Sequence, residues 1–316
     1  MKPFAFVFPG QGSQAVGMLD AWGEHPAVLE TLREASEALG EDLRTLIREG
    51  SKEALGLTTN TQPVMLVAGV AAYRAWLSET GAAPAVLAGH SLGEYSALVA
   101  SGVLSLVQAA PLVRFRAQAM QEAVPVGVGA MAAILGMQAA DVIEGCAEAV
   151  RTFGVGTIEV VEAVNFNDPM QTVIAGSKAA VEKACEVLKA NGAKRALPLP
   201  VSAPFHSSLM KPAADKLKEK LASVRFDAPQ IPVINNIEVA AETDPDRIRA
   251  ALYAQAFGPV RWVECVQAIQ ARGITNIVEC GPGKVLAGMV KRIDAGLTGL
   301  AMFDPASLAQ AKEMLQ

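Results

Sequence analysis

The chain has 316 residues, a length that fits about two domains or one large domain with an insertion. Hydrophobic residues make up 51% of the chain and charged residues 19%, which excludes a disordered chain, a coiled coil and collagen. The formal net charge of −5 argues against nucleic acid and anionic membranes as partners.

Cysteine usage and the N-terminal segment indicate the compartment. The cysteines are far apart and form neither a C-x-x-C pair nor a cluster with histidines, so we expect no disulfide scaffold and no metal site. Segment 1–8 is apolar but too short for the core of a signal peptide, and polar residues, proline or glycine interrupt every long uncharged stretch. We therefore expect a cytoplasmic protein without a membrane segment.

Short apolar strands alternate with helices in the first part of the chain. The sequence predicts strands over 4–8 and 85–88. It predicts helices over 27–39, 52–55, 63–72 and 94–100, with Pro63 in the first turn of the third helix. This alternation favours a parallel sheet covered by helices.

The middle of the chain has a different order of elements. Strands are expected over 129–135, 158–165, 171–175 and 194–199, and helices over 139–150 and 178–189. This βαββαβ order predicts a ferredoxin-like subdomain of residues 126–199, inserted in an α/β core of residues 1–125 and 200–316. The core resumes with helices over 211–223, 246–257 and 284–293 and strands over 231–234 and 274–279.

Segment 89–93 reads Gly-His-Ser-Leu-Gly, a G-x-S-x-G pattern between a predicted strand and a predicted helix. Flanking glycines permit a sharp strand-to-helix turn, and the helix N-terminus favours developing negative charge. The pattern predicts that Ser91 is a nucleophile on an α/β-hydrolase-like core. The alternative is a glycine-rich turn whose serine only caps the next helix.

A serine nucleophile needs a base, and the chain has three histidines. His25 lies in a polar turn, where we expect it in solvent. His90 adjoins Ser91 and should point elsewhere, in a structural role. His206, in the loop after the insertion, remains as the base. In the usual hydrolase order an acid stands between the serine and the histidine, but the acids of the middle region fall within the predicted insertion. We therefore expect another acceptor, such as a backbone or side-chain carbonyl, to orient the imidazole.

Two further features concern anions. Segment 10–15 matches G-x-G-x-x-A, but the acidic residue of a dinucleotide site is missing from its place, and the loop suits an oxyanion better. Arg114 and Arg116 interrupt an apolar stretch. We expect one to bind a carboxylate or phosphate and the other to lie on the surface.

Six ordered segments together carry a family resemblance. They resemble the bacterial malonyl-CoA:acyl-carrier-protein transacylases of type II fatty acid synthesis, and they are segments 6–13, 61–63, 89–95, 120–125, 203–207 and 279–284. The match spans essentially the whole chain. It implies a ping-pong transfer of malonyl from malonyl-CoA to the phosphopantetheine thiol of acyl carrier protein through a malonyl-serine, with no cofactor and no metal.

The resemblance assigns the catalytic roles. It implies that Ser91 is acylated, that His206 is its base and that Arg116 binds the malonyl carboxylate. It also implies that the backbone N–H groups of Gln11 and Leu92 form the oxyanion hole.

Four other positions follow from the same resemblance. The backbone carbonyl of Gln255 would orient the imidazole, and Gln62 would line the pocket. Phe205 is compatible with excluding a methylmalonyl group, although its segment reads Ala-Pro-Phe-His where malonyl-specific polyketide domains have His-Ala-Phe-His. The resemblance leaves open the roles of Asn165, Asn235 and Asn236.

An acidic carrier protein needs a local basic patch on this acidic chain, in a transient electrostatic complex with a monomer. The candidates are Lys194 with Arg195, the lysines 211, 216, 218 and 220, and Lys284 with Lys291 and Arg292. A solvated helix face explains the second group equally well. Alternative functions are an acyltransferase of a polyketide or malonate pathway, a serine thioesterase or esterase with no need for Arg116, and a scaffold with a vestigial site.

Overall fold

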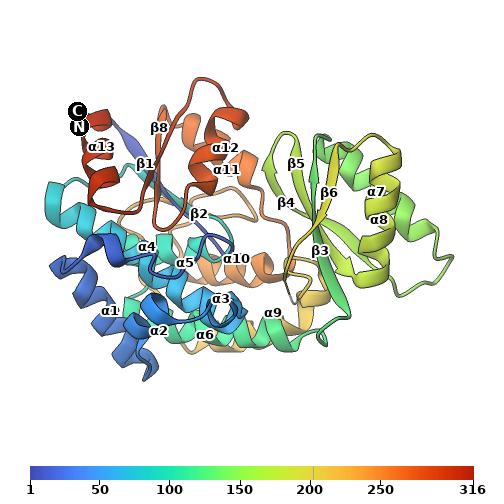
Figure 1. The fold of residues 1–316 in the computed structure, drawn as a ribbon, viewed down its shortest axis with the longest axis horizontal. Coiled ribbons are helices and arrows are strands. Elements are labelled where there is room, and N and C mark those ends of the chain that lie inside the picture. Colours follow the sequence, from blue (N-terminus) through green and yellow to red (C-terminus); the bar gives the residue numbers. More distant parts are fainter. Residues whose placement is uncertain (202) are drawn as a thin grey trace.

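A five-stranded parallel sheet forms the centre of the larger part of the molecule (Figure 1). The computed structural model describes residues 1–201 and 203–316. The strands follow the spatial order β7-β2-β1-β8-β9, and they are β1 (Phe4–Phe8), β2 (Val86–Gly89), β7 (Val233–Ile234), β8 (Asn276–Cys280) and β9 (Thr298–Met302). The sequence of β1 is entirely apolar because both faces of this central strand are buried.

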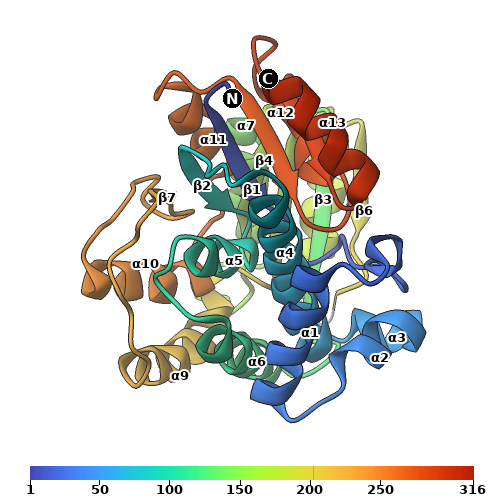
Figure 2. The ribbon, with the colours of Figure 1, turned by 90° about the vertical axis from the view of Figure 1, so that its left-hand side faces the viewer.

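Helices cover both faces of this sheet. Phe4, Phe6 and Phe8 pack on the face of α1 (Pro26–Leu39), α4 (Thr58–Thr80), α5 (Gly93–Ala100) and α6 (Leu106–Glu122). Figure 2 shows these helices gathered on one side of the strands. Ala5 and Val7 face α11 (Trp262–Gln270) and α12 (Val285–Ile293) on the other side. The remaining helices of this part are α2 (Leu43–Glu49), α3 (Lys52–Gly56), α9 (Lys211–Ala222), α10 (Pro245–Phe257) and α13 (Pro305–Leu315).

A separate antiparallel sheet forms the smaller part, with the order β4-β5-β3-β6 (Figure 1). Its strands are β3 (Gly129–Leu135), β4 (Val161–Asp168), β5 (Gln171–Ser177) and β6 (Arg195–Pro198), and α7 (Ala139–Arg151) and α8 (Lys178–Ala190) cover one face. Ala132 and Ile134 pack under these helices, whereas Met131 and Ala133 face the main core. The predicted βαββαβ order and the α/β class are confirmed.

Strand β4 attaches the small sheet to the larger part. The N–H of Phe166 donates to the carbonyl oxygen of Val260 at 3.0 Å, and the N–H of Val260 donates to the carbonyl oxygen of Val164 at 2.8 Å. Arg292 on α12 forms an ion pair of 2.8 Å with Asp168 at the end of β4. The two parts therefore meet along a line that continues to the cavity described below.

Several predicted elements need correction. Helix α4 begins at Thr58, because the carbonyl of Leu57 already accepts from the N–H groups of Asn60 and Thr61, so Pro63 lies inside the helix rather than in its first turn. Strand β4 spans Val161–Asp168 rather than the expected 158–165, and Asp168 pairs with Gln171 across a turn at residues 169 and 170. Helices α2, α6, α11 and α13 and strand β9 were not predicted from the sequence. Among the described residues, no helix is long and apolar enough to cross a bilayer.

Candidate active site

Ser91 occupies a sharp turn between β2 and α5. Its φ is 52°, a left-handed value that non-glycine residues rarely adopt. A Cβ atom on Gly89 would lie 1.9 Å from the carbonyl carbon of Gly93, and one on Gly93 would lie 2.1 Å from the carbonyl oxygen of Phe8. The turn therefore requires glycine on both sides of the serine, as the G-x-S-x-G pattern predicts.

The side chain of Asn236 holds this turn from behind. Its Oδ1 accepts from the Ser91 N–H at 2.8 Å, and its Nδ2 donates to the Gly89 carbonyl oxygen at 2.7 Å. The sequence left the role of Asn236 open because nothing local marks a side chain that bonds to the backbone of a distant turn. His90 points away from the serine, with Nε2 2.8 Å from Oδ1 of Asn167, which agrees with the structural role expected for it.

His206 is placed to accept the serine proton. Its Nε2 lies 2.7 Å from Ser91 Oγ, and its Nδ1 lies 2.9 Å from the backbone carbonyl oxygen of Gln255. A carbonyl only accepts, so Nδ1 carries the proton and Nε2 presents its lone pair to the hydroxyl. Burial, followed by the charge of Arg116, lowers the pKa of His206 to about 3, so the imidazole is neutral at pH 7.

Arg116 is buried on α6 with its guanidinium against the same serine. Nη1 donates to Oε1 of Gln62 at 2.8 Å, and Nη2 lies 3.1 Å from Oε1 of Gln255 and 3.2 Å from Ser91 Oγ. All of these partners are neutral, and across the described chain no carboxylate is bonded to Arg116. Arg114 does not line the cavity around Ser91 but forms an ion pair with Glu41, and its side chain is only 16% exposed, so the expected surface position is met only in part.

A cavity of about 110 Å³ brings the predicted residues together. Its lining includes seven of them, namely Gln11, Gln62, Ser91, Leu92, Arg116, Phe205 and His206. Gln255 is fully buried behind the cavity. A second cavity of about 210 Å³ extends between the two sheets to α12, and it shares with the first the lining residues Gln11, His90, Asn165 and Leu199. A long acyl donor or acceptor arm can therefore reach Ser91 from the junction of the two parts.

Gln11 and Leu92 both line the cavity around Ser91. Within residues 1–201 and 203–316, neither backbone N–H donates a hydrogen bond to another part of the chain. Leu92 also precedes the first turn of α5, whose N–H groups favour negative charge. Both groups remain available to an oxyanion on a carbonyl attacked by Ser91.

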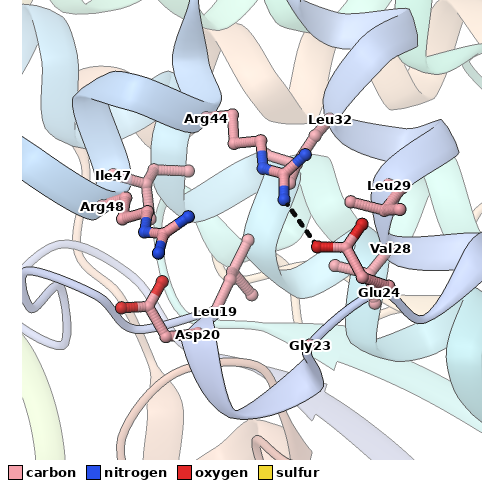
Figure 3. Close-up of a pocket in the computed structure, with 10 residues that line it drawn as sticks. All are labelled: Leu19, Asp20, Gly23, Glu24, Val28, Leu29, Leu32, Arg44, Ile47 and Arg48. Atoms are coloured by element: carbon pink, nitrogen blue, oxygen red, sulfur yellow. Dashed lines mark hydrogen bonds and ion pairs between the residues drawn. The ribbon is translucent and has the colours of Figure 1, made fainter.

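Another pocket, of about 180 Å³, lies between α1 and α2 (Figure 3). Arg44 bonds to Glu24 across it at 2.9 Å, and its lining contains no serine, cysteine or histidine. It therefore offers no serine or cysteine nucleophile and no imidazole, and its carboxylates are those of Asp20 and Glu24. In the part of the chain that the structure describes, no group of three or more His, Cys, Asp or Glu side chains is arranged to hold a metal ion.

The environment of His25 differs from the prediction, and the role of Glu94 was not predicted. His25 is not solvated, because its side chain is only 15% exposed and packs on the ring of Trp22. Glu94 was seen only as part of a motif, yet it is 2% exposed and bonds to both Gln255 and Asn236. An acidic residue in the first turn of a helix usually indicates dipole stabilisation at the surface, so its type and position gave no signal of this role.

The sequence pattern of the acyl transferase domain matches residues 5–295. The chain belongs to this family. The acyl transferase is 53% identical over 315 residues to the malonyl CoA-acyl carrier protein transacylase of Escherichia coli strain K12. The aligned region covers 99% of this chain and 100% of that protein. The predicted resemblance and the enzyme class are thereby confirmed.

Solved structures agree with the acyl transferase assignment. The acyl-carrier-protein S-malonyltransferase from Burkholderia pseudomallei 1710b is 63% identical, with a TM-score of 0.95 and coverage of 99% of this chain and 100% of that chain. A malonyl-transacylase solved in complex with a type II PKS acyl-carrier protein is 49% identical, with a TM-score of 0.95 and coverage of 99% and 100%.

Proposed function

We propose that the chain transfers the malonyl group from malonyl-CoA to the phosphopantetheine thiol of acyl carrier protein, and so supplies fatty acid synthesis. The observation that carries this proposal is a serine–histidine–carbonyl arrangement beside a buried arginine. The serine, the histidine and the arginine line one cavity, and among the described residues the hydrogen-bond partners of the arginine are neutral. The names of its relatives support the same reaction.

Acylation follows from the geometry. Ser91 Oγ attacks the thioester carbonyl while its proton moves to His206 Nε2, and the Gln255 carbonyl holds the imidazolium that forms. The N–H groups of Gln11 and Leu92 stabilise the oxyanion, each by about 3 kcal/mol. Collapse of the tetrahedral intermediate breaks the C–S bond, and the CoA sulfur leaves with the proton from His206. The product is a malonyl ester on Ser91.

Arg116 supplies selectivity for the malonyl group. A carboxylate that replaces its neutral acceptors gains charge-assisted hydrogen bonds worth about 1.5–3 kcal/mol each. The same carboxylate offsets the positive charge that lowers the pKa of His206, which makes the imidazole a stronger base. An acetyl group does neither, so Arg116 favours malonyl in binding and in chemistry. Phe205, which lines the cavity, is proposed to exclude a methyl branch.

The second half-reaction runs in reverse with a different thiol. The phosphopantetheine sulfur attacks the malonyl ester, His206 takes the thiol proton and returns it to Ser91 Oγ, and malonyl leaves as a thioester on the carrier protein. Apolar residues such as Met120, Met131 and Leu199 line the cavity and limit the access of water to the ester.

The carrier protein is proposed to dock where the second cavity opens between the two sheets. Leu135 pairs with both Arg195 and Gln171, and Gln171 lines that cavity, so Arg195 lies on the same row of the small sheet. Val285, which follows Lys284, lines the opposite side. We define the cleft-mouth patch as Lys194, Arg195, Lys284, Lys291 and Arg292, all of them exposed; the ion pair with Asp168 offsets part of the charge of Arg292.

The lysines of α9 are the weaker docking candidates. Lys211 is paired with Asp215 and Lys216 with Glu122, so part of their charge is already neutralised. Their helix packs on α6 and α10, and none of its lysines lines either cavity.

Other parts of the proposal concern organisation. A core of residues 1–125 and 200–316 and an inserted subdomain of residues 126–199 are supported by the separate sheets and by the small sheet's own hydrophobic cluster. The enzyme is proposed to act in the cytoplasm as a monomer, without cofactor, membrane or nucleic acid.

Intact-mass spectrometry after mixing with malonyl-CoA tests the central step. A single malonyl adduct on the wild type that is absent from Ser91→Ala supports the proposal. A wild type that stays unmodified contradicts it.

A further inference from the structure

Glu94 is a buried carboxyl group that the proposed mechanism does not use. It lies in the first turn of α5, three residues after Ser91, and is 2% exposed. Its Oε2 accepts two hydrogen bonds of 2.9 Å each, from the backbone N–H of Asn236 and from Nε2 of Gln255. A carboxyl group buried this deeply loses its hydration, so its position needs an explanation in the contacts that it makes.

Gln255 connects Glu94 to the base and to the arginine. Its Nε2 donates to Glu94 and, at 3.1 Å, to the carbonyl oxygen of Ser91, while its Oε1 accepts from Arg116 at 3.1 Å. Rotating the amide by half a turn would bring its NH₂ group against the guanidinium and its oxygen against the carboxylate. Glu94 and Arg116 therefore fix one orientation of this side chain, on the same residue whose backbone carbonyl holds His206.

Asn236 connects Glu94 to the turn that carries the nucleophile. Glu94 holds its backbone N–H, and the Asn236 side chain in turn bonds to the Ser91 N–H and to the Gly89 carbonyl. One short segment contains Gly89, Ser91 and Glu94. Asn236 lies just after β7, and Gln255 lies on α10. One oxygen atom thus joins the nucleophile turn to the segments that carry the base support.

We propose, on the basis of the proposed function, that Glu94 is a positioning residue whose Oε2 sets the Ser91–His206 alignment through Gln255 and Asn236. Its length and its acceptor oxygen carry this role, since both donors are neutral N–H groups that bind one oxygen. Burial raises the pKa of Glu94 to about 7, against the opposing effects of Gln255, Asn236 and Arg116. A protonated carboxyl with its proton on Oε1 still accepts both bonds, so a full negative charge is not required.

Two single substitutions of Glu94 separate the effect of side-chain length from the effect of charge. Glu94→Asp keeps the charge but is one methylene shorter and cannot hold both donors. Glu94→Gln keeps the length and one acceptor oxygen but removes the charge. Glu242→Gln is the matched control, because Glu242 borders the same small cavity as Glu94 and bonds to Arg247 rather than to the site.

The measurement is the single-turnover rate of acylation by malonyl-CoA, followed by intact mass as a function of substrate concentration. For Glu94→Asp we expect the maximal rate to fall at least about fivefold while the half-saturating concentration changes less than about threefold. The maximal rate of Glu94→Gln should stay within about threefold of the wild-type rate, and the rate of Glu242→Gln should equal that of the wild type. Thermal unfolding of all variants separates alignment from stability.

Three outcomes overturn the proposal. They are a Glu94→Asp variant as fast as the wild type, an impaired Glu94→Gln beside an intact Glu94→Asp, and a rate loss in Glu94→Asp fully explained by its unfolded fraction. If Glu94→Asp does not fold, an impaired but folded Glu94→Gln contradicts the proposal and an intact one supports it. Failure of the proposed function is seen separately, because the wild type itself then forms no adduct.

Discussion

The Nδ1 atom of His206 lies 2.9 Å from the backbone carbonyl oxygen of Gln255, in the place where many serine hydrolases have a carboxylate. A carbonyl fixes the tautomer as an acid does, but it adds no negative charge next to the imidazole. Burial and the neighbouring Arg116 lower the pKa of His206 in the substrate-free site from 6.5 to about 3, so the imidazole stays neutral well below pH 6.5. The pH dependence of acylation should report this environment.

The kcat/KM for acylation by malonyl-CoA should not fall through protonation of His206 between about pH 8 and pH 5. The active form is the neutral imidazole, and the pKa of His206 is lowered from 6.5 to about 3, so the base form persists as the pH falls. Arg116→Gln removes one of the two main causes and should move the acidic limb to higher pH. An acidic limb of the wild type centred near pH 6.5 in kcat/KM, which reports the free enzyme, would contradict this prediction.

Arg116→Ala should reduce kcat/KM for malonyl-CoA by about 10- to 100-fold, since at least one charge-assisted hydrogen bond is lost. Acetyl-CoA has no carboxylate to lose, so the preference for malonyl over acetyl should fall by a similar factor. Arg114→Ala is the matched control on the same helix, because Arg114 bonds to Glu41 and does not line the cavity around Ser91. Competition between the two thioesters measures the preference, and an unchanged ratio in Arg116→Ala removes this residue from its role.

Arg195→Glu should raise the KM for acyl carrier protein at least about threefold and leave acylation by malonyl-CoA unchanged. The reversed charge repels an acidic partner at the cleft-mouth patch but does not touch the cavity. Lys216→Glu on α9 serves as the control. Equal effects of the two variants, or an equal loss in both half-reactions of Arg195→Glu, would place the docking face elsewhere.

Gly93→Ala should destabilise the protein by about 3 kcal/mol or more, because the added Cβ would lie 2.1 Å from the carbonyl oxygen of Phe8. Gly288→Ala is the opposite case. No heavy atom lies within 4 Å of its added Cβ, and the residue is in helix α12, so stability should stay level or rise by about 0.5–1 kcal/mol. Urea unfolding measures both, and similar losses in the two variants would refute the steric argument.

The sequence predicted best those features that are encoded locally. The glycines around Ser91 and the strand before it define the turn, and the alternation of elements defines both sheets. Helix α6 was missed because Pro111, Arg114 and Arg116 interrupt its apolar pattern, although the capping box at Ser105 and Gln108 marks its start.

The remaining site residues depend on contacts between distant segments. Gln255 contributes a backbone carbonyl, which every residue type has, so only the family resemblance indicated its position. The hydrogen bond between Asn236 and Ser91 joins residues 145 positions apart, and the one between Asn236 and Glu94 joins residues 142 positions apart. No periodicity in the sequence reveals such pairs. His206 could be selected only because the other two histidines were less suitable.

The most direct test of the central claim follows the fate of the malonyl enzyme. The adduct is separated from malonyl-CoA, divided between buffer and buffer with phosphopantetheinylated acyl carrier protein, and each sample is followed by intact mass. We predict rapid loss of the adduct only with the carrier protein, together with a malonyl mass increase on that protein. Equally rapid loss in buffer alone, with release of free malonate, would identify a hydrolase and contradict acyl transfer.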